Sequence, residues 1–411
     1  MARRSGPRRT TVAVLTAAAL LLPAAAGCGG PADAAGDGTE YTVTTWAPAD
    51  RPGVTALAEA IGRDLAARGG LNGHRLRVLT CDERDSAEGA AACARQAVDA
   101  RAVAVIGAFG EHADGVMPVL EAAGIPYLGG YGMSGAEFSS PLSYPVSGGT
   151  PALIAGSGRQ LVAAGCKQVA LVRPDTRAGD TLTRYLSTAL RPTGVRLVDV
   201  KTPEKDPDFQ AVARQALGQD QRGGCVSNAL DPERSLKLLD AYRRLAPRNT
   251  LLASVAGSVQ QSVIESISGG NGALDGALAT GWYPPATSKV WDDLRTVAGG
   301  DRRIDVSDLG VQTTWVAYQV FLQAADRIHS AGQPLTAKAL RAQLDSGDSL
   351  DTGGATPPLN WGMTDMLPSA ESPRLTNTWV TYQQIKGGRL TEQQSGFVDV
   401  RWVLTGGRPP A

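Results

Sequence analysis

The most constraining feature of this chain is a regular alternation of short strand-like runs with helical patterns, which extends over residues 41–280. Strands are predicted at 41–46, 76–80, 102–106 and 125–128, and then at 168–172, 195–200, 224–228, 251–254 and 277–280. Apolar residues at helical spacing fill the intervals between them. Strands that alternate with helices favour parallel sheets, because each helical crossover returns the chain in the same direction.

The series starts again near residue 148, so the sequence predicts two doubly wound α/β lobes rather than one long sheet. A length of 411 residues is enough for two domains of ordinary size. Two further helices are expected at 309–329 and 336–344. The remaining segment differs: 352–361 is rich in turn formers, and 377–385 and 397–403 alternate like antiparallel strands.

The first 28 residues have the layout of a targeting segment. Four arginines (Arg3, Arg4, Arg8 and Arg9) precede an apolar stretch over 12–26, which is shorter than a membrane-spanning helix requires. The segment ends in Ala25-Ala26-Gly27-Cys28, a sequence similar to a bacterial lipobox, so Cys28 is the expected lipidation site. The alternatives are plain secretion after cleavage at an alanine and, from the paired arginines, twin-arginine export.

A lipid on Cys28 would hold the protein on the extracytoplasmic face of the cell membrane. Residues 29–40, rich in Gly, Ala and Asp, cannot bury enough surface to fold, and they are predicted to be a flexible tether.

Four other cysteines remain: Cys81, Cys93, Cys166 and Cys225. In an exported chain they suggest two disulfides, for which three pairings exist. The simplest is Cys81 with Cys93 and Cys166 with Cys225. A metal site is the alternative, but CxxC spacing and nearby histidines are lacking.

Charge and motifs argue against several classes of function. Forty basic residues balance forty acidic ones, which leaves no basic field for nucleic acid. The segment Gly156-Ser157-Gly158 lacks the spacing of a nucleophile elbow, no phosphate-binding loop is present, and only three histidines occur. We therefore expect no enzymatic activity, no cofactor and no metal.

Several segments resemble known proteins in their order and spacing. They are 67–78 (ARGGLNGHRLRV), the turn Cys81-Asp82, 103–107 (VAVIG), 123–126 (AGIP) and 206–209 (DPDF). Together they resemble the type 1 periplasmic binding proteins, in particular the Leu/Ile/Val-binding-like group of ABC transporter substrate-binding proteins. The segment Gly353-Gly354 to Pro357-Pro358-Leu359 is similar to actinobacterial lipoprotein members.

The resemblance implies a hinged, discontinuous architecture: an N-terminal lobe of 41–147 plus 282–350 and a C-terminal lobe of 148–281 plus 351–411. It implies a monomer that binds a small-molecule solute between its lobes, at the carboxyl ends of the strands, and delivers it to an ABC transporter permease. Two alternatives stay open: a ligand-sensing module for a membrane receptor or kinase, and a surface interaction protein without a transport role.

Strand ends and the resemblance together select the candidate ligand-binding residues. These are Trp46, Phe109, Glu111, Tyr131, Ser134, Arg177 and Trp282. In the family, a hydroxyl that holds the ligand carboxylate lies where this chain has Glu111, whereas Ser134 matches a second hydroxyl. An aromatic residue and an acidic residue of the family fall near Ala178 and Ala256. A standard α-amino acid is therefore not the expected ligand.

The aromatic residues with Glu111 suit a cationic or planar solute. Each candidate also has a structural interpretation. Trp46 could pack at the hinge, Glu111 could cap the following helix, Arg177 could be a solvated loop charge, and Trp282 could anchor a crossover.

Overall fold

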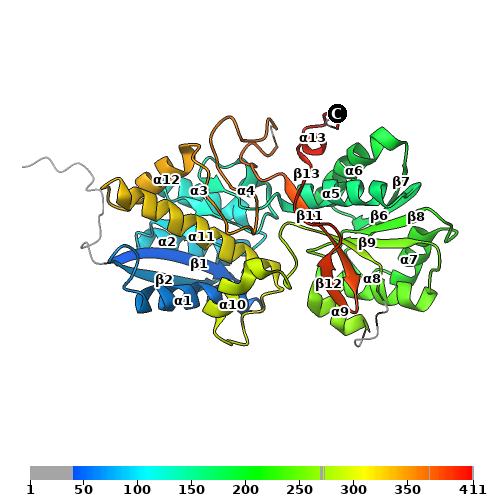
Figure 1. Cartoon of the computed structure of the whole chain (residues 1–411), viewed down its shortest axis with the longest axis horizontal. Coiled ribbons are helices and arrows are strands. Elements are labelled where there is room, and N and C mark those ends of the chain that lie inside the picture. Colours follow the sequence, from blue (N-terminus) through cyan, green and yellow to red (C-terminus); the bar gives the residue numbers. More distant parts are fainter. Residues whose placement is uncertain (1–39, 269–271, 273, 370, 410–411) are drawn as a thin grey trace, which may run out of the picture. The chain divides into compact units, whose positions relative to one another are not determined.

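The computed structural model describes residues 40–268, 272, 274–369 and 371–409, which form two α/β lobes, each built around its own sheet (Figure 1). The targeting segment, Cys28 and nearly all of the predicted tether lie outside the described residues.

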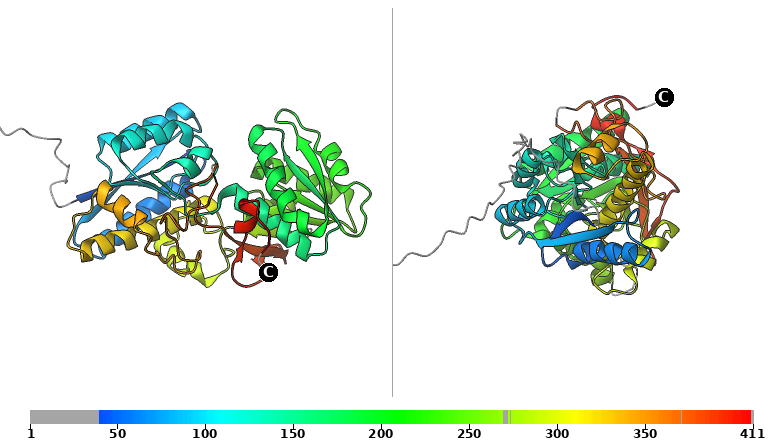
Figure 2. Two further views of the ribbon diagram at one scale, coloured as in Figure 1. Left: turned by 90° about the horizontal axis from the view of Figure 1, so that it is seen from above. Right: turned by 90° about the vertical axis from the view of Figure 1, so that its left-hand side faces the viewer.

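The first sheet is entirely parallel, in the order β2-β1-β3-β4-β5. Its strands are β1 (Glu40–Ala47), β2 (Arg75–Asp82), β3 (Ala104–Ile106), β4 (Tyr127–Leu128) and β5 (Ser143–Tyr144). Its helices are α1 (Pro52–Ala67), α2 (Ala87–Asp99), α3 (Ala113–Ala123) and α4 (Gly135–Ser139), joined later in the chain by α10 (Asp292–Ala298), α11 (Leu309–Ser330) and α12 (Ala337–Asp345). Helices cover both faces of the sheet (Figure 2), as expected of a buried parallel sheet.

The second sheet has the order β12-β11-β10-β9-β8-β6-β7. Its parallel strands are β6 (Gln168–Pro174), β7 (Arg196–Thr202), β8 (Gly224–Asn228), β9 (Leu251–Val255) and β10 (Leu278–Gly281). Helix α5 (Gly149–Ala163) precedes them, and α6 (Arg177–Leu190) with the 3₁₀ turn η1 (Arg191–Thr193), α7 (Phe209–Leu217), α8 (Pro232–Leu245) and α9 (Gln261–Ser268) connect them. A second 3₁₀ turn, η2 (Lys289–Trp291), lies between β10 and α10.

The C-terminal segment makes this second sheet mixed. Strands β11 (Trp379–Lys386) and β12 (Arg389–Glu392) form a hairpin that pairs antiparallel with β10, and β13 (Val398–Asp399) pairs with β11. The strand predicted over 397–403 is wrong beyond residue 399, because α13 (Arg401–Leu404) follows. Val400, Val403 and Leu404 are all buried, and this i, i+3, i+4 spacing is that of a helix.

Three connections carry the chain between the sheets: 145–148, 282–291 and 346–378. The last of them contacts the first lobe. Arg374 donates a 2.9 Å hydrogen bond to the backbone oxygen of Ser143 and pairs with Asp345, and the Trp361 ring packs edge-on against Tyr144. The two-lobe fold is confirmed, whereas the exact lobe boundaries stay a prediction.

Both disulfides are present in the simplest of the pairings. Cys81–Cys93 joins the end of β2 to α2, and Cys166–Cys225 joins the turn after α5 to β8. Within the described residues, no helix combines the length and the apolar character that crossing a bilayer demands.

Candidate functional site

Three of the predicted residues come together where strands of the two sheets end. Phe109 follows β3, Tyr131 follows β4, and Trp282 follows β10. The ring centroids of Phe109 and Tyr131 lie 4.3 Å apart, and those of Tyr131 and Trp282 lie 5.4 Å apart in an edge-on arrangement. We call these three residues the aromatic cluster. Its geometry is that of favourable aromatic pairing.

Loops of both sheets meet at this cluster. The hydroxyl of Tyr131 is 3.9 Å from the position that a Cβ on Gly257, after β9, would occupy. Trp282 is 1 % exposed and donates its indole N–H to the backbone oxygen of Gly149, at the start of α5. Burial raises the pKa of Tyr131 well above its ordinary value, so this hydroxyl is neutral. The arrangement brings a neutral phenol of one lobe next to the backbone of the other.

A buried carboxylate shapes the loop that carries Tyr131. Glu137, on α4, accepts backbone hydrogen bonds from Gly132, Met133 and Ser134 at 3.0, 2.8 and 2.9 Å. Burial raises the pKa of Glu137, and the three N–H donors partly offset that rise. Gly130 is required here, because a Cβ at this position would lie 2.1 Å from the Glu137 carboxylate.

Charged groups surround the aromatic cluster. The guanidinium of Arg51 lies 5.1 Å from the Phe109 ring centroid, in cation–π geometry, and pairs with Asp308 at 3.4 Å. Desolvation by the neighbouring loops, together with the negative charge of Asp85, raises the pKa of Glu111. Asp231, which begins α8 in the second lobe, raises it further, so acidic groups of both lobes act on one another.

A second acid of this region is more deeply buried. Glu83, just after β2, is 1 % exposed, and its Oε1 has no hydrogen-bond partner in the described part of the chain. Desolvation raises its pKa to about 7. The carboxylate packs directly on Gly110, where a Cβ would lie 2.3 Å from it. Sequence reasoning missed Glu83, although its position at the end of a parallel strand was an available signal.

Three other predicted site residues do not belong to the aromatic cluster: Trp46, Ser134 and Glu111. Trp46 is 1 % exposed and packs on Tyr127, at a centroid distance of 5.9 Å, in the core between β1 and helices α2 and α3. The hydroxyl oxygen of Ser134 is buried and has no partner among the described residues. Glu111 is exposed in the loop after β3.

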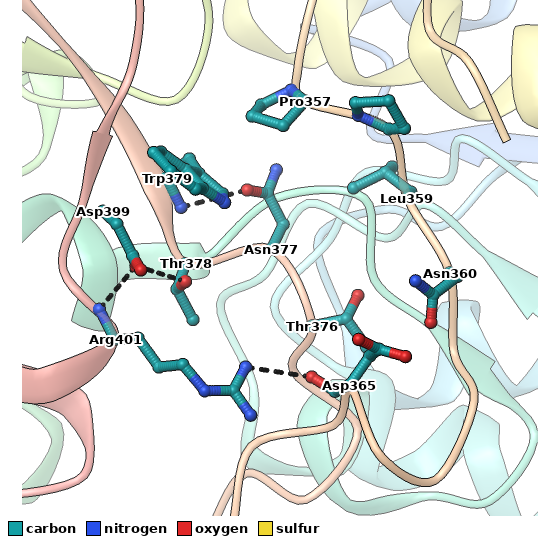
Figure 3. Close-up of a pocket in the computed structure, with 11 residues that line it drawn as sticks. Pro357, Leu359, Asn360, Asp365, Thr376, Asn377, Thr378, Trp379, Asp399 and Arg401 are labelled. Carbon is teal, nitrogen blue, oxygen red and sulfur yellow. Dashed lines mark hydrogen bonds between the residues drawn. The ribbon is translucent and has the colours of Figure 1, made fainter. Parts of the chain in front are cut away.

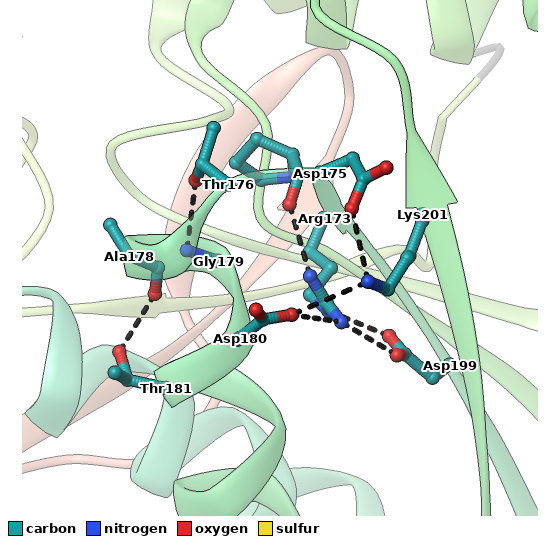
Figure 4. A network of polar contacts seen from close by, with 10 residues as sticks. Arg173, Asp175, Thr176, Ala178, Gly179, Asp180, Thr181, Asp199 and Lys201 are labelled. Atoms are coloured by element: carbon teal, nitrogen blue, oxygen red, sulfur yellow. Dashed lines mark hydrogen bonds and ion pairs between the residues drawn. The ribbon is translucent and has the colours of Figure 1, made fainter.

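Arg177 is exposed at the first position of α6, in the second lobe. Beside it lies a network of charges that the sequence did not indicate (Figure 4). Arg173, 2 % exposed, donates two 2.7 Å hydrogen bonds to Asp199 and also pairs with Asp180. Lys201 pairs with Asp175 at 3.0 Å. The network ties the ends of β6 and β7 to the start of α6.

A pocket of about 220 Å³ lies beside the second connection between the sheets. Its wall combines Leu309 and Gln312 of α11 with Ala256, Gln260 and Tyr283. Ala256 is the position at which the resemblance places an ammonium-binding acid. No residue of the aromatic cluster lines this pocket.

Comparison with known proteins agrees with this architecture. A family model described as periplasmic binding protein matches residues 38–378. No curated protein sequence matches the chain. Among solved structures, an extracellular ligand-binding receptor from Verminephrobacter eiseniae is 19 % identical, with a TM-score of 0.72 over 86 % of this chain and 99 % of that one.

Two further structures are similar. A possible leucine/isoleucine/valine-binding protein from Rhodopirellula baltica is 16 % identical, with a TM-score of 0.69 over 87 % of this chain and 96 % of that one. A fatty acid ABC transporter substrate-binding protein from Thermomonospora curvata is 14 % identical, with a TM-score of 0.68 over 86 % and 91 %. At such identities the similar structures show the fold alone. The family model, in contrast, matches most of the sequence. The chain therefore belongs to the periplasmic binding protein family.

Proposed function

We propose that this protein is an extracytoplasmic solute-binding lipoprotein, which captures a small molecule between its lobes and delivers it to an ABC transporter permease. Membership of the periplasmic binding protein family supports this function. The observation that carries it is the meeting of loops from both sheets at Tyr131, Trp282 and Gly257. Ligands of open α/β sheets bind at the carboxyl ends of strands, where these loops lie. One solved relative of the same fold is itself named as an ABC transporter substrate-binding protein.

The proposed ligand is a cationic or planar solute rather than a standard α-amino acid. Glu111 stands where the resemblance places a hydroxyl for the ligand carboxylate, and Asp231 adds negative charge from the other lobe. Two acids would repel a carboxylate. Arg51 already covers the Phe109 ring and Trp282 is 1 % exposed, so a ligand cation would use the Tyr131 ring instead. Aromatic faces beside a carboxylate favour a cation with delocalised or shielded charge.

Thermal unfolding of the full chain, purified in detergent, tests this ligand class. Matched panels of cationic, neutral and anionic solutes would be compared, because a ligand at 100 times its Kd stabilises a protein by about 2.7 kcal/mol. We expect cationic or planar neutral solutes to raise the unfolding temperature. Among responding cations, Glu111→Gln is expected to weaken binding by about twofold to fivefold, the range of an exposed charge pair.

The control is Glu88→Gln, which removes an exposed charge from the first turn of α2 without touching the loops that carry the cluster. A response confined to anionic solutes would contradict the proposed ligand class. Absence of any responding solute, together with no co-purified small molecule in native mass spectrometry, would contradict solute capture itself.

The proposal also covers the lobe boundaries, the N-terminal segment and the oligomeric state. The lobes are proposed to comprise 41–147 with 282–350, and 148–281 with 351–411. Within the targeting segment 1–28, residues 1–27 are proposed to be removed, which leaves Cys28 as a lipid-bearing N-terminus and 29–40 as its tether. The protein is proposed to act as a monomer at the membrane surface.

A further inference from the structure

A second pocket, far along the chain from the aromatic cluster, is built by the third connection between the sheets and by the C-terminal segment (Figure 3). Its volume is about 180 Å³, room for about six water molecules at the ~30 Å³ that each occupies in the liquid. Asn360, Asp365 and Thr376 lie on one side, and Trp379 and Asp399 lie on the other. Pro357 and its neighbours complete the wall.

The polar groups of this pocket are held in place by hydrogen bonds, but part of their hydrogen-bonding capacity has no partner in the described chain. Asp399 accepts hydrogen bonds on Oδ1 from the Thr378 hydroxyl and the Arg401 backbone N–H, at 2.6 and 2.8 Å, and its Oδ2 has no partner among the described residues. The Asn360 oxygen accepts from the Gly362 N–H, which leaves its amide N–H₂ group unpaired within the same part of the chain.

Thr376 provides the strongest argument for a polar ligand in this pocket. Its hydroxyl oxygen is buried and has no hydrogen-bond partner in the described chain. Buried hydroxyls are normally satisfied, so an orphan that lines a pocket points to a ligand or to bound water. This hydroxyl can both donate and accept.

The mixture of charged and polar groups in the pocket disfavours both an anion and a simple cation as the ligand. The carboxylates of Asp365 and Asp399 oppose an anion. A simple cation would leave the Asn360 and Thr376 donors unpaired and would face the guanidinium of Arg401, which donates to the backbone oxygens of Asp365 and Met366. Hydroxyl groups use donors and acceptors alike, and the Trp379 ring with Pro357 offers apolar surface to the C–H face of a ring.

We propose that this pocket binds one sugar residue, either a free monosaccharide or a terminal unit of a cell-surface glycan. Asp365, Asp399, Asn360 and Thr376 would hold its hydroxyls. Trp379, Asp399 and Arg401 lie beyond residue 378, where the match to the family model ends. It is independent of the solute proposed for the aromatic cluster.

Saturation-transfer NMR on the full chain tests the proposal, with glucose, galactose and N-acetylglucosamine as free probes and soluble cell-wall fragments as the glycan probe. We expect at least one probe to bind, and Thr376→Val to weaken it by tenfold or more. Because the Thr376 hydroxyl is buried and makes no bond in the described chain, this variant is expected to keep or raise its unfolding temperature. Asp365→Asn is expected to act in the same direction.

Thr296→Val is the matched control, since this exposed threonine of α10 lies outside the pocket and its hydroxyl donates only to the backbone oxygen of Asp292 in its own helix. Tighter binding of the cell-wall fragments than of any free sugar would assign the glycan as the source, and the reverse would assign the free sugar. The proposal is overturned if no probe binds, if binding survives both Thr376→Val and Asp365→Asn, or if Glu111→Gln abolishes it, because the sugar would then occupy the other site.

Discussion

Glu83 shows how a single side chain can make the fold sensitive to pH. Its carboxyl is buried against Gly110, and desolvation raises its pKa from 4.5 to about 7. The charges that act on it are His112, which lowers the pKa, and Asp85, Glu111 and Asp82, which raise it. Burial without a partner for Oε1 outweighs the nearby histidine, so the protonated form is favoured in the native state.

This shift predicts the sign of a pH effect on stability. Between pH 4.5 and about 7 the native state binds a proton at Glu83 that the unfolded chain releases, so the contribution of this residue to the free energy of unfolding falls as the pH rises. The full change is at most about 3 kcal/mol, at 1.36 kcal/mol for each unit of pKa. Glu83→Gln cannot titrate, and we expect it to be more stable than the wild type at pH 8 and similar to it at pH 4.5.

Urea unfolding at the two pH values measures this difference, with Glu88→Gln as an exposed control. Curves of stability against pH that run parallel in Glu83→Gln and the wild type would show that Glu83 has an ordinary pKa.

A short helix and a long helix both position the candidate site. Helix α4 has five residues, yet its Glu137 holds the loop after β4 through three backbone N–H groups. Helix α11, with 22 residues, packs so closely that a Cβ on Gly107 would lie 2.7 Å from the backbone of Thr314. The loops that carry Phe109 and Tyr131 therefore begin from strands packed against rigid neighbours.

Replacing the Glu137 carboxylate tests the role of α4. In Glu137→Gln, one amide oxygen must serve three N–H donors and the new N–H₂ group faces them, so buried donors stay unpaired at about 1–3 kcal/mol each. We expect the free energy of unfolding to fall by about 2–3 kcal/mol in urea titrations. An unchanged unfolding midpoint would mean that the loop is held by its other contacts.

The whole molecule combines two lobes, two disulfides and a proposed lipid anchor. Each disulfide joins a strand to a helix or turn that neighbours the same sheet, so neither ties the two sheets together. Disulfides persist in oxidising compartments, which agrees with the proposed location outside the cytoplasm. A lipid chain at Cys28, followed by a polar tether, would leave both lobes free of the bilayer.

The anchor predicts how the protein divides between membrane and solution. With Cys28→Ser we expect the protein to move from the membrane fraction to the soluble fraction, because the thiol that carries the lipid is gone. Mass spectrometry of the N-terminal peptide would detect the lipid directly in the wild type. Equal membrane retention of the variant would argue for plain secretion or for an uncleaved segment.

Sequence alone determined the fold class, because alternating strand and helix patterns reflect local periodicity that survives without tertiary contacts. It also placed Phe109, Tyr131 and Trp282 at strand ends, where the structure brings their rings together, since the ends of parallel strands converge at one edge of a sheet. Their role in ligand binding stays a prediction. The tertiary structure alone decided that Trp46 lies in the core with Tyr127, that Glu83 is buried without a partner, and that residues 397–403 end in a helix. Those outcomes depend on which distant segments pack together, and packing between distant segments leaves no periodic trace in the sequence.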